Sequence, residues 1–223
     1  RRIAHGGNRA LRSLMTLSDP DPEAGWTRDA FAAIMRGMDA APEKLVQSLA
    51  EGEVRLEPFD EQFREGLRAA CAADPDIWEI YPVSMIGEHF DASLERMLEF
   101  HRADRWVPLI ALCRDEVVGM SSYIAPDGRN RVVEIGGTYI APEMRGGSFN
   151  AAMKRLMIDH ALACGFTRIE FRVDTRNGRS MRALEKLGAT REGVLRKDRI
   201  TWTGHVRDTA VFSILAEEWP KKP

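Results

Sequence analysis

The sequence predicts an α/β protein of the α+β type, in which a mixed, mostly antiparallel central sheet carries helices on both faces. Two observations predict this fold class. First, three strand-like segments joined by short turns follow one another in residues 107–141, as in an antiparallel sheet. Second, helix, strand and helix patterns alternate in residues 149–187, as in a crossover that adds a parallel strand. A sheet with both kinds of connection is covered by helices on both faces.

The predicted domain opens with a strand and two helices. Val54 and Leu56 alternate with charged residues, which is typical of a strand. Asp60 can cap the helix that follows, because apolar residues recur after it at helical spacing. A second amphipathic helix is predicted around residues 94–98. Residues 74–90 between the helices are rich in aromatic side chains and are expected to form a loop.

The remaining elements follow from turn residues and hydrophobic periodicity. An Asp115-Glu116 turn and a Pro-Asp-Gly turn separate three predicted strands, over residues 107–113, 117–125 and 131–141. Glycine ends each of two later helices, because Gly165 and Gly188 follow the last periodic residues. The later helices and strands are predicted over residues 149–164, 168–173, 179–187, 192–197 and 206–215.

The composition is that of a globular protein with a core of its own. Of 223 residues, 44% are hydrophobic and 30% are charged. The three cysteines are odd in number and far apart, which argues against a disulfide framework or a zinc ribbon, and we expect no metal. No apolar run approaches the roughly 18 residues that cross a bilayer, and no signal peptide is evident. We therefore expect a cytoplasmic protein without membrane contact.

The first 50 residues are predicted to be an extension of the main domain. We expect residues 1–26 to be disordered, because they are basic at first and then linker-like in composition. Thr27 and Pro42 can each begin a short helix, so residues 27–50 are predicted to be helical and are a candidate dimer contact. The main domain is expected over residues 51–220. Whether the residues before the first methionine belong to the natural protein stays open.

The segment with the clearest chemistry is the loop of residues 145–150, called loop 145–150 below. Gly146 and Gly147 allow a close approach of the backbone to a ligand, and the helix that begins after them favours phosphate oxygens at its N-terminus. Arg145 can add a charge-assisted hydrogen bond. Residues 145–199 hold 13 basic against 6 acidic side chains, which favours a small polyanionic ligand over nucleic acid. An ordinary glycine-rich turn has the same spacing.

The order of elements and four local motifs resemble the GNAT superfamily of acetyl-CoA-dependent N-acetyltransferases over about residues 52–220. Loop 145–150 matches the family signature at Arg145, although Ser148 and Asn150 stand where glycine or alanine is usual. Its sequence, Arg-Gly-Gly-Ser-Phe-Asn, is similar to the RimJ/RimL-like branch, whose members acetylate the N-termini of ribosomal proteins. The other three motifs lie in residues 174–188, 192–197 and 206–215.

The resemblance implies that acetyl-CoA is the cosubstrate and that an amine acceptor attacks its thioester directly. The acceptor would be a protein N-terminus or a small-molecule amine, and the sequence does not choose between them. Loop 145–150 would hold the pyrophosphate, while the preceding strand end and the later helix start would flank the pantetheine arm. The implied binding residues are Ile140, Ala141, Arg145, Gly146, Gly147, Ser148, Phe149, Asn150, Asn177 and Ser180. The alternative function is that of a non-catalytic acyl-CoA-binding regulatory module.

Glu134 is the first candidate for the base that deprotonates the amine. On a regular strand Glu134 shares a face with Gly136 and Thr138, and the glycines leave room beside it for an amine. The alternative is a structural carboxylate that pairs with Arg131 or Arg172. A β-bulge in the strand would change which residues share its face.

Three further groups complete the candidate catalytic machinery. Glu170 or a water relay is the reserve base. The backbone N–H of Ile140 is the candidate donor to the oxyanion that forms when the amine attacks. Many GNAT enzymes place a tyrosine where this chain has Leu184, so Ser180, one helical turn earlier, is the candidate proton donor to the leaving thiolate. Ser180 could instead cap its helix or bind the pantetheine arm.

Overall fold

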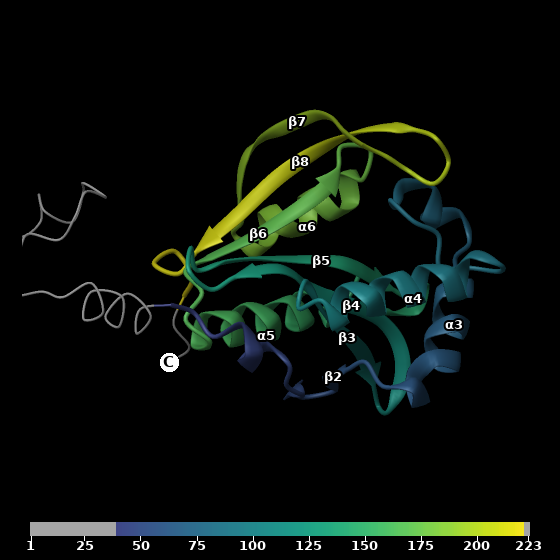
Figure 1. Ribbon diagram of the computed structural model, residues 1–223, viewed down its shortest axis with the longest axis horizontal. Coiled ribbons are helices and arrows are strands. Elements are labelled where there is room, and N and C mark those ends of the chain that lie inside the picture. Colours follow the sequence, from purple (N-terminus) through teal and green to yellow (C-terminus); the bar gives the residue numbers. More distant parts are fainter. Residues whose placement is uncertain (1–38, 221–223) are drawn as a thin grey trace, which may run out of the picture. The chain divides into compact units, whose positions relative to one another are not determined.

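An eight-stranded sheet runs through residues 39–220, the part of the chain that the computed structural model describes (Figure 1). The strand order is β1-β2-β3-β4-β5-β6-β8-β7. Each neighbouring pair is antiparallel except β5 and β6, so the predicted mixed, mostly antiparallel sheet is confirmed. The strands are β1 (Leu49–Glu51), β2 (Val54–Pro58), β3 (Trp106–Cys113), β4 (Glu116–Asp127), β5 (Val132–Ile140), β6 (Arg168–Asp174), β7 (Thr190–Ile200) and β8 (Val206–Leu215).

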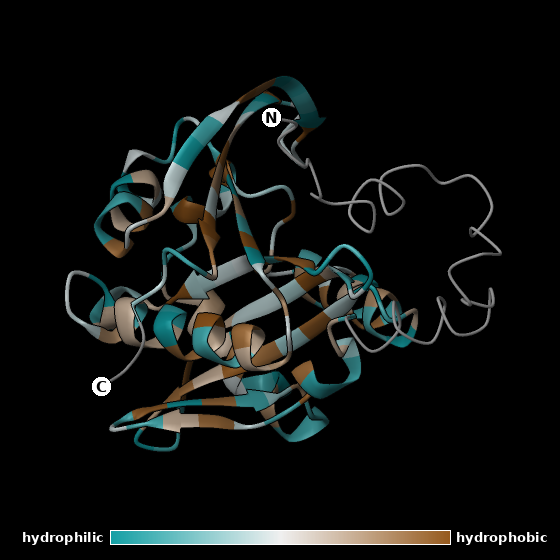
Figure 2. Cartoon of the chain, turned by 90° about the vertical axis from the view of Figure 1, so that its left-hand side faces the viewer, coloured by the Kyte–Doolittle hydropathy of each residue, from teal (hydrophilic) through white to brown (hydrophobic). Residues whose placement is uncertain are grey.

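Helices cover both faces of the sheet, as predicted. Met153 of α5 and Leu184 of α6 are buried in one hydrophobic cluster, and Leu67 of α3 and Leu94 of α4 are buried in a second cluster on the opposite face. In Figure 2 the helical ribbons change between hydrophilic and hydrophobic residues, as expected for helices with one face on a core. The α-helices are α3 (Arg64–Ala72), α4 (His89–Arg102), α5 (Phe149–Ala163) and α6 (Gly178–Leu187), and the 3₁₀ helices are η2 (Pro42–Leu45), η3 (Glu61–Phe63), η4 (Asp76–Ile80) and η5 (Pro142–Met144).

The predicted helix boundaries depend on local capping, and the structure contains the expected caps. Asp60 accepts a hydrogen bond from the Gln62 N–H at 3.0 Å and caps η3, the turn that leads into α3. Gly165 and Gly188 follow α5 and α6 with φ of +95° and +97°, the left-handed conformation that glycine adopts without strain. The helices therefore end where the sequence predicts.

The predicted helix after Pro42 is wrong. Pro42 begins only the short 3₁₀ helix η2, and the chain then forms strand β1, whose Glu51 pairs with Val54 of β2. Leu45 and Leu49 have the i, i+4 spacing of a helix, yet both are buried in the cluster under α5. Pairing with β2 outweighs the local periodicity here. The expected disorder of residues 1–26 and the helix expected from Thr27 lie outside the described residues.

A shortened chain tests whether the domain needs residues 40–50. We expect a chain that begins at Glu51 to melt at least about 10 °C below a chain that begins at Ala40. Each buried leucine side chain contributes about 2 kcal/mol, so losing Leu45 and Leu49 removes roughly 4 kcal/mol before strand β1 is counted. Calorimetric melting of the two chains measures the difference. Equal melting temperatures would show that residues 51–220 fold without this segment.

The turn between β3 and β4 lies one residue earlier than predicted. Cys113 pairs with Glu116, so the two-residue turn is Arg114-Asp115 rather than Asp115-Glu116. Both turn residues have positive φ, 49° and 69°, which matches the right-handed twist of a hairpin. Strand β4 also continues through Asp127, beyond the predicted end of that strand.

Strand β5 contains a bulge that changes the faces of its side chains. Ser122 of β4 pairs with Gly136 and Met120 pairs with Tyr139, so Gly137 and Thr138 both lie opposite a single residue of β4. Gly137 has a φ of +59°. The predicted sharing of a face by Glu134, Gly136 and Thr138 is therefore wrong, because the bulge turns Thr138 to the α5 face. Glu134 and Gly136 stay on the face that carries α3 and α4.

Candidate functional site

Strands β5 and β6 separate in the middle of the sheet. They pair only over Val132–Glu134 and Arg168–Glu170, after which β5 continues beside β4 and β6 continues beside β8. The ribbon in Figure 1 shows these strands close at one end of β5 and apart at the other. The carboxyl-terminal half of β5 therefore has backbone groups on one side that no neighbouring strand occupies. We call this region the β5–β6 gap.

The backbone of Ile140 is directed into the β5–β6 gap. Ala141 donates its N–H to the Val118 carbonyl at 2.8 Å, and Ile140 lies opposite Gly119. In an antiparallel pair, hydrogen-bonded and non-hydrogen-bonded positions alternate, so the N–H of Ile140 points away from β4. Its carbonyl, on the same side, accepts a hydrogen bond from Arg145 Nε at 2.7 Å. The N–H predicted to donate to an oxyanion thus points toward the gap.

Loop 145–150 lies between η5 and α5 and leaves the start of α5 without a side-chain cap. Gly146 has a φ of +81°, which confirms that this position needs glycine. Gly147 has an ordinary φ, and apart from its chain neighbours no atom of the described residues lies within 4 Å of the position that its Cβ would occupy. Ser148 makes no side-chain capping hydrogen bond. The α5 N-terminus therefore keeps the backbone donors and dipole end that bind an anion.

Arg145 is held within the fold rather than projecting from loop 145–150. Its guanidinium pairs with Asp74, and its carbon lies 5.5 Å from the centre of the Tyr139 ring. The side chain is only 18% exposed. Arg145 thus joins loop 145–150 to the end of β5 and to the segment before η4.

Glu134 is largely buried and lies beside Arg172. Glu134 Oε2 is 3.4 Å from Arg172 Nε, so the structure contains the predicted pairing with Arg172. Burial raises the pKa of Glu134, and the positive charge of Arg172 acts against that increase. A Cβ at Gly136 would lie 2.7 Å from Glu134 Oε1, so the carboxyl group occupies the space that this glycine leaves. A carboxylate with a raised pKa has the property that a general base needs.

Glu170 is the register partner of Glu134, but both of its oxygens face arginines. Oε1 accepts from Arg168 Nε at 2.9 Å, and Oε2 lies 3.5 Å from Arg172. Arg168 also forms a two-pronged pair with Glu192, with both distances 2.6 Å. Because its oxygens are engaged in this network, Glu170 is less suited than Glu134 to accept a proton from a ligand.

Asn177 and Ser180 lie at the start of α6, directly after strand β6. Asn177 Oδ1 accepts a hydrogen bond from the Ser180 N–H at 3.0 Å, so Asn177 is the N-cap of α6. The capping role that the sequence left open for Ser180 thus belongs to Asn177. Leu184, in the position of the missing tyrosine, is buried in the cluster under α6. Asn177 and Ser180 thus both lie just after the end of β6, as predicted.

Two further groups contact the β5 bulge: Tyr81 of the aromatic loop, which could shape an acceptor pocket or cover the core, and Lys154, which the sequence did not suggest as a site residue. The Tyr81 hydroxyl donates to the Thr138 carbonyl at 2.7 Å, which brings the aromatic loop against the bulge. Lys154 of α5 is buried, and its Nζ donates to Thr138 Oγ1. The sequence did contain a sign that Lys154 is unusual, because this lysine lies among the apolar residues Met153 and Met157 on the buried face of a predicted helix.

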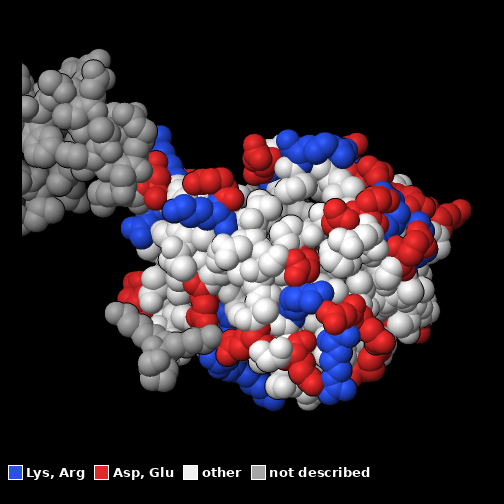
Figure 3. Space-filling view, turned by 90° about the horizontal axis from the view of Figure 1, so that it is seen from below, with Lys and Arg blue, Asp and Glu red and all other residues white. Residues whose placement is uncertain are grey.

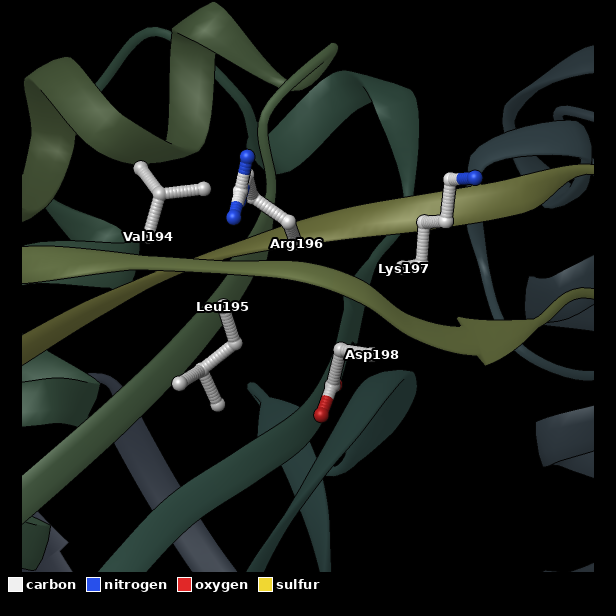
Figure 4. Close-up of a pocket in the computed structure, with 5 residues that line it drawn as sticks. All are labelled: Val194, Leu195, Arg196, Lys197 and Asp198. Carbon is white, nitrogen blue, oxygen red and sulfur yellow. The ribbon is translucent and has the colours of Figure 1, made fainter.

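Two surface concavities adjoin these elements. A groove of about 410 Å³ is lined on one side by Arg145, Gly147 and Ser148 of loop 145–150, and it also includes the side chains of Glu51, Glu53 and Glu143. A second concavity, of about 670 Å³, follows residues 194–198 of β7. Figure 4 shows that Leu195 and Asp198 point to one side of β7. Leu195 pairs with Thr209 of β8, which places it on the sheet face that carries Glu134.

Charge on the visible surface is mixed. In Figure 3 acidic and basic side chains are interspersed and leave uncharged areas between them, rather than forming a broad basic surface on that face. Among residues 39–220, no group of three or more His, Cys, Asp or Glu side chains is placed to hold a metal ion. No helix in the same part of the chain has the length and apolar character required to cross a membrane.

Comparisons with known proteins agree with this geometry. The family model of the GNAT acetyltransferase domain matches residues 53–190. A crystal structure from T. thermophilus, classed as an acetyltransferase, is 35% identical, with a TM-score of 0.70 over 78% of this chain and 92% of that chain. One from Chromobacterium violaceum, classed in the GNAT family, is 26% identical, with a TM-score of 0.73 over 92% and 98%.

A more distant structure shares the fold. Mycobacterium smegmatis RimJ, solved in complex with CoA-disulfide, is 22% identical, with a TM-score of 0.70 over 80% of this chain and 91% of that chain. No curated protein sequence matches the chain.

Proposed function

Because the chain belongs to the GNAT acetyltransferase family, we propose that it transfers the acetyl group of acetyl-CoA to a primary amine by direct attack on the thioester. The observation that carries the proposal is the β5–β6 gap, into which the N–H of Ile140 points. The uncapped N-terminus of α5 lies at the end of β5, one short loop away. A backbone donor next to an anion-binding helix start fits a ligand with a carbonyl at one end and phosphates at the other.

Acetyl-CoA binding is proposed to depend mostly on backbone groups. The N–H groups of loop 145–150 and of the first turn of α5 would bind the pyrophosphate, since Ser148 does not occupy them as a cap. The pantetheine arm would follow β5 past Ile140 and Ala141, with Asn177 and Ser180 on the opposite side of the gap. The complex of Mycobacterium smegmatis RimJ with CoA-disulfide supports this assignment, because the two proteins share the fold.

The proposed reaction uses Glu134 as the base. Glu134 removes a proton from the ammonium group, and the neutral amine attacks the thioester carbon while the N–H of Ile140 stabilises the oxyanion. The carbon–sulfur bond then breaks and the nitrogen of the new amide loses its second proton to water. The thiolate takes a proton from water, either directly or through Ser180, which water then reprotonates. A Ser180→Ala variant with an unchanged kcat would show that water protonates the thiolate directly.

Glu134 faces the side of the sheet that the β7 concavity borders, so the acceptor is proposed to enter there.

Release of free CoA in the presence of different amines tests the proposed function. We expect thiol release with at least one acceptor among peptides with free N-termini and small polyamines, and none with the same peptides after N-terminal acetylation. The blocked peptides are matched controls, because they keep side chains and lose only the nucleophile. Binding of acetyl-CoA without thiol release in any amine would favour the alternative, a non-catalytic acyl-CoA-binding module.

A further inference from the structure

Lys154 is buried on the inner face of α5, although lysine side chains are seldom buried without a carboxylate partner. The residue is 6% exposed, and Nζ donates to Thr138 Oγ1 at 2.5 Å and to Ser121 Oγ at 3.3 Å. Neither contact is a carboxylate. The lysine therefore lies where a charged group loses its hydration and gains only neutral partners.

Lys154 donates to two hydroxyl oxygens that are also bonded to each other. Ser121 Oγ and Thr138 Oγ1 are 2.8 Å apart, and Ser121 Oγ is also 3.5 Å from the Gly136 carbonyl. An ammonium group has no lone pair, so each hydroxyl oxygen accepts from Lys154. An ammonium group has three N–H donors, and these two hydroxyls accept only two of them.

The Nζ atom of Lys154 lies beside the β5–β6 gap. Thr138 belongs to the bulge of β5, and the ring centre of Phe171 on β6 is 5.9 Å from Nζ. Nζ therefore lies between the two strands on their α5 side, beyond the point where their pairing ends at Glu134. One helical turn before Lys154, Asn150 Oδ1 is buried and has no hydrogen-bond partner among the described residues. An unfilled donor and an unfilled acceptor thus lie next to each other on α5.

We infer that Lys154 binds a carbonyl oxygen at the acyl end of acetyl-CoA through the third N–H of its ammonium group. This inference rests on the proposed function, because it needs the cosubstrate to lie in the β5–β6 gap. The carbonyl belongs either to the thioester or to the adjacent pantetheine amide, and both have the same acceptor chemistry. The partner group in the protein is Asn150, whose Oδ1 would accept an amide N–H of the pantetheine arm.

Binding of acetyl-CoA through Lys154 should change the number of protons bound to the protein. Burial lowers the pKa of Lys154 to about 7, while the negative charge of Glu134 acts in the opposite direction. The side chains that face Lys154 from β4 and β6, Ser121 and Phe171, are uncharged. A carbonyl acceptor favours the ammonium form, so binding raises the pKa of Lys154. Near pH 7.5 the protein should therefore take up protons when the cosubstrate binds, and affinity should fall as pH rises further.

Titration calorimetry of the full chain at pH 7.5, in phosphate and in Tris, tests the inference. These buffers differ in ionisation enthalpy, so proton uptake appears as a difference between the two binding enthalpies. We expect uptake by the unaltered chain, and at least about tenfold weaker binding without uptake by Lys154→Met. Lys186→Met is the matched control, because Lys186 is exposed on α6, and it should keep both affinity and uptake. Glu134→Gln should still show proton uptake, which assigns the uptake to Lys154 rather than to Glu134.

The same titration with CoA identifies the carbonyl. Uptake with acetyl-CoA but not with CoA would assign the contact to the thioester, and uptake with both would assign it to the pantetheine amide. Acetyl-CoA binding by the unaltered chain with equal enthalpies in both buffers would overturn the inference, even if Lys154→Met fails to fold. A lysine that only holds the bulge would also give equal enthalpies. Absence of any acetyl-CoA binding would instead contradict the proposed function.

Discussion

Glu134→Gln should lower kcat by about 10²–10⁴-fold, the range by which a general base accelerates proton transfer. The substitution keeps the size of the side chain and the neighbouring Gly136 space, but it removes the group that accepts the proton. The unaltered enzyme should gain activity as pH rises through the pKa of Glu134, which burial has raised, because only the carboxylate is a base. The variant should lose that limb of the pH profile. Steady-state rates from pH 5 to pH 9, at saturating acetyl-CoA, measure both effects.

Glu170→Gln is the matched control for Glu134→Gln. The two glutamates are register partners on adjacent strands, and each lies near Arg172. Glu170 is also bound to Arg168, so its loss should alter packing or substrate affinity more than the pH profile. If Glu134→Gln kept full activity at every pH while Glu170→Gln lost the rising limb, the two assignments would be exchanged. Full activity in both variants would leave a water relay as the base.

Gly147→Val should weaken acetyl-CoA binding by about tenfold or more, which corresponds to roughly 1.4 kcal/mol. Gly147 has an ordinary φ and open space around its Cβ position among the described residues, so the added Cβ meets none of them. The added side chain would instead occupy the space in front of the α5 N-terminus, where the pyrophosphate is proposed to bind. Titration calorimetry gives the dissociation constant, and calorimetric melting should give an unchanged melting temperature.

Gly193→Val provides the control for a glycine-to-valine change in open space. Gly193 lies on β7, also has nothing within 4 Å of its Cβ position, and is remote in sequence from loop 145–150. This variant should bind acetyl-CoA as the unaltered chain does. Equal affinities for Gly147→Val and the unaltered chain would remove loop 145–150 from the binding site, whatever the result for the enzyme's activity.

The N-terminus of α5 shows how far sequence reasoning reaches at the candidate site. The two glycines before an apolar helix pattern predicted a helix start that could bind an anion, and Gly146 with its φ of +81° agrees. Arg145 was expected to add its charge to that site. In the structure its guanidinium also pairs with Asp74, 71 positions earlier in the chain, and no local pattern relates two residues at that separation.

The sequence by itself determined the order and type of most elements, from β2 to β8, because these depend on local signals. Hydrophobic periodicity placed α5 and β8, and the glycines at 165 and 188 marked the ends of α5 and α6. Only the tertiary structure decided which face each side chain of β5 takes. The bulge at Gly137 arises from the pairing of β5 with β4, and a shift of one residue moves every later side chain to the opposite face. That shift places the side chains of Glu134 and Thr138 on opposite faces of the sheet, so that Thr138 faces α5 and accepts a hydrogen bond from Lys154. This contact depends on how strand β5 packs against helix α5, and a local sequence pattern does not contain that information.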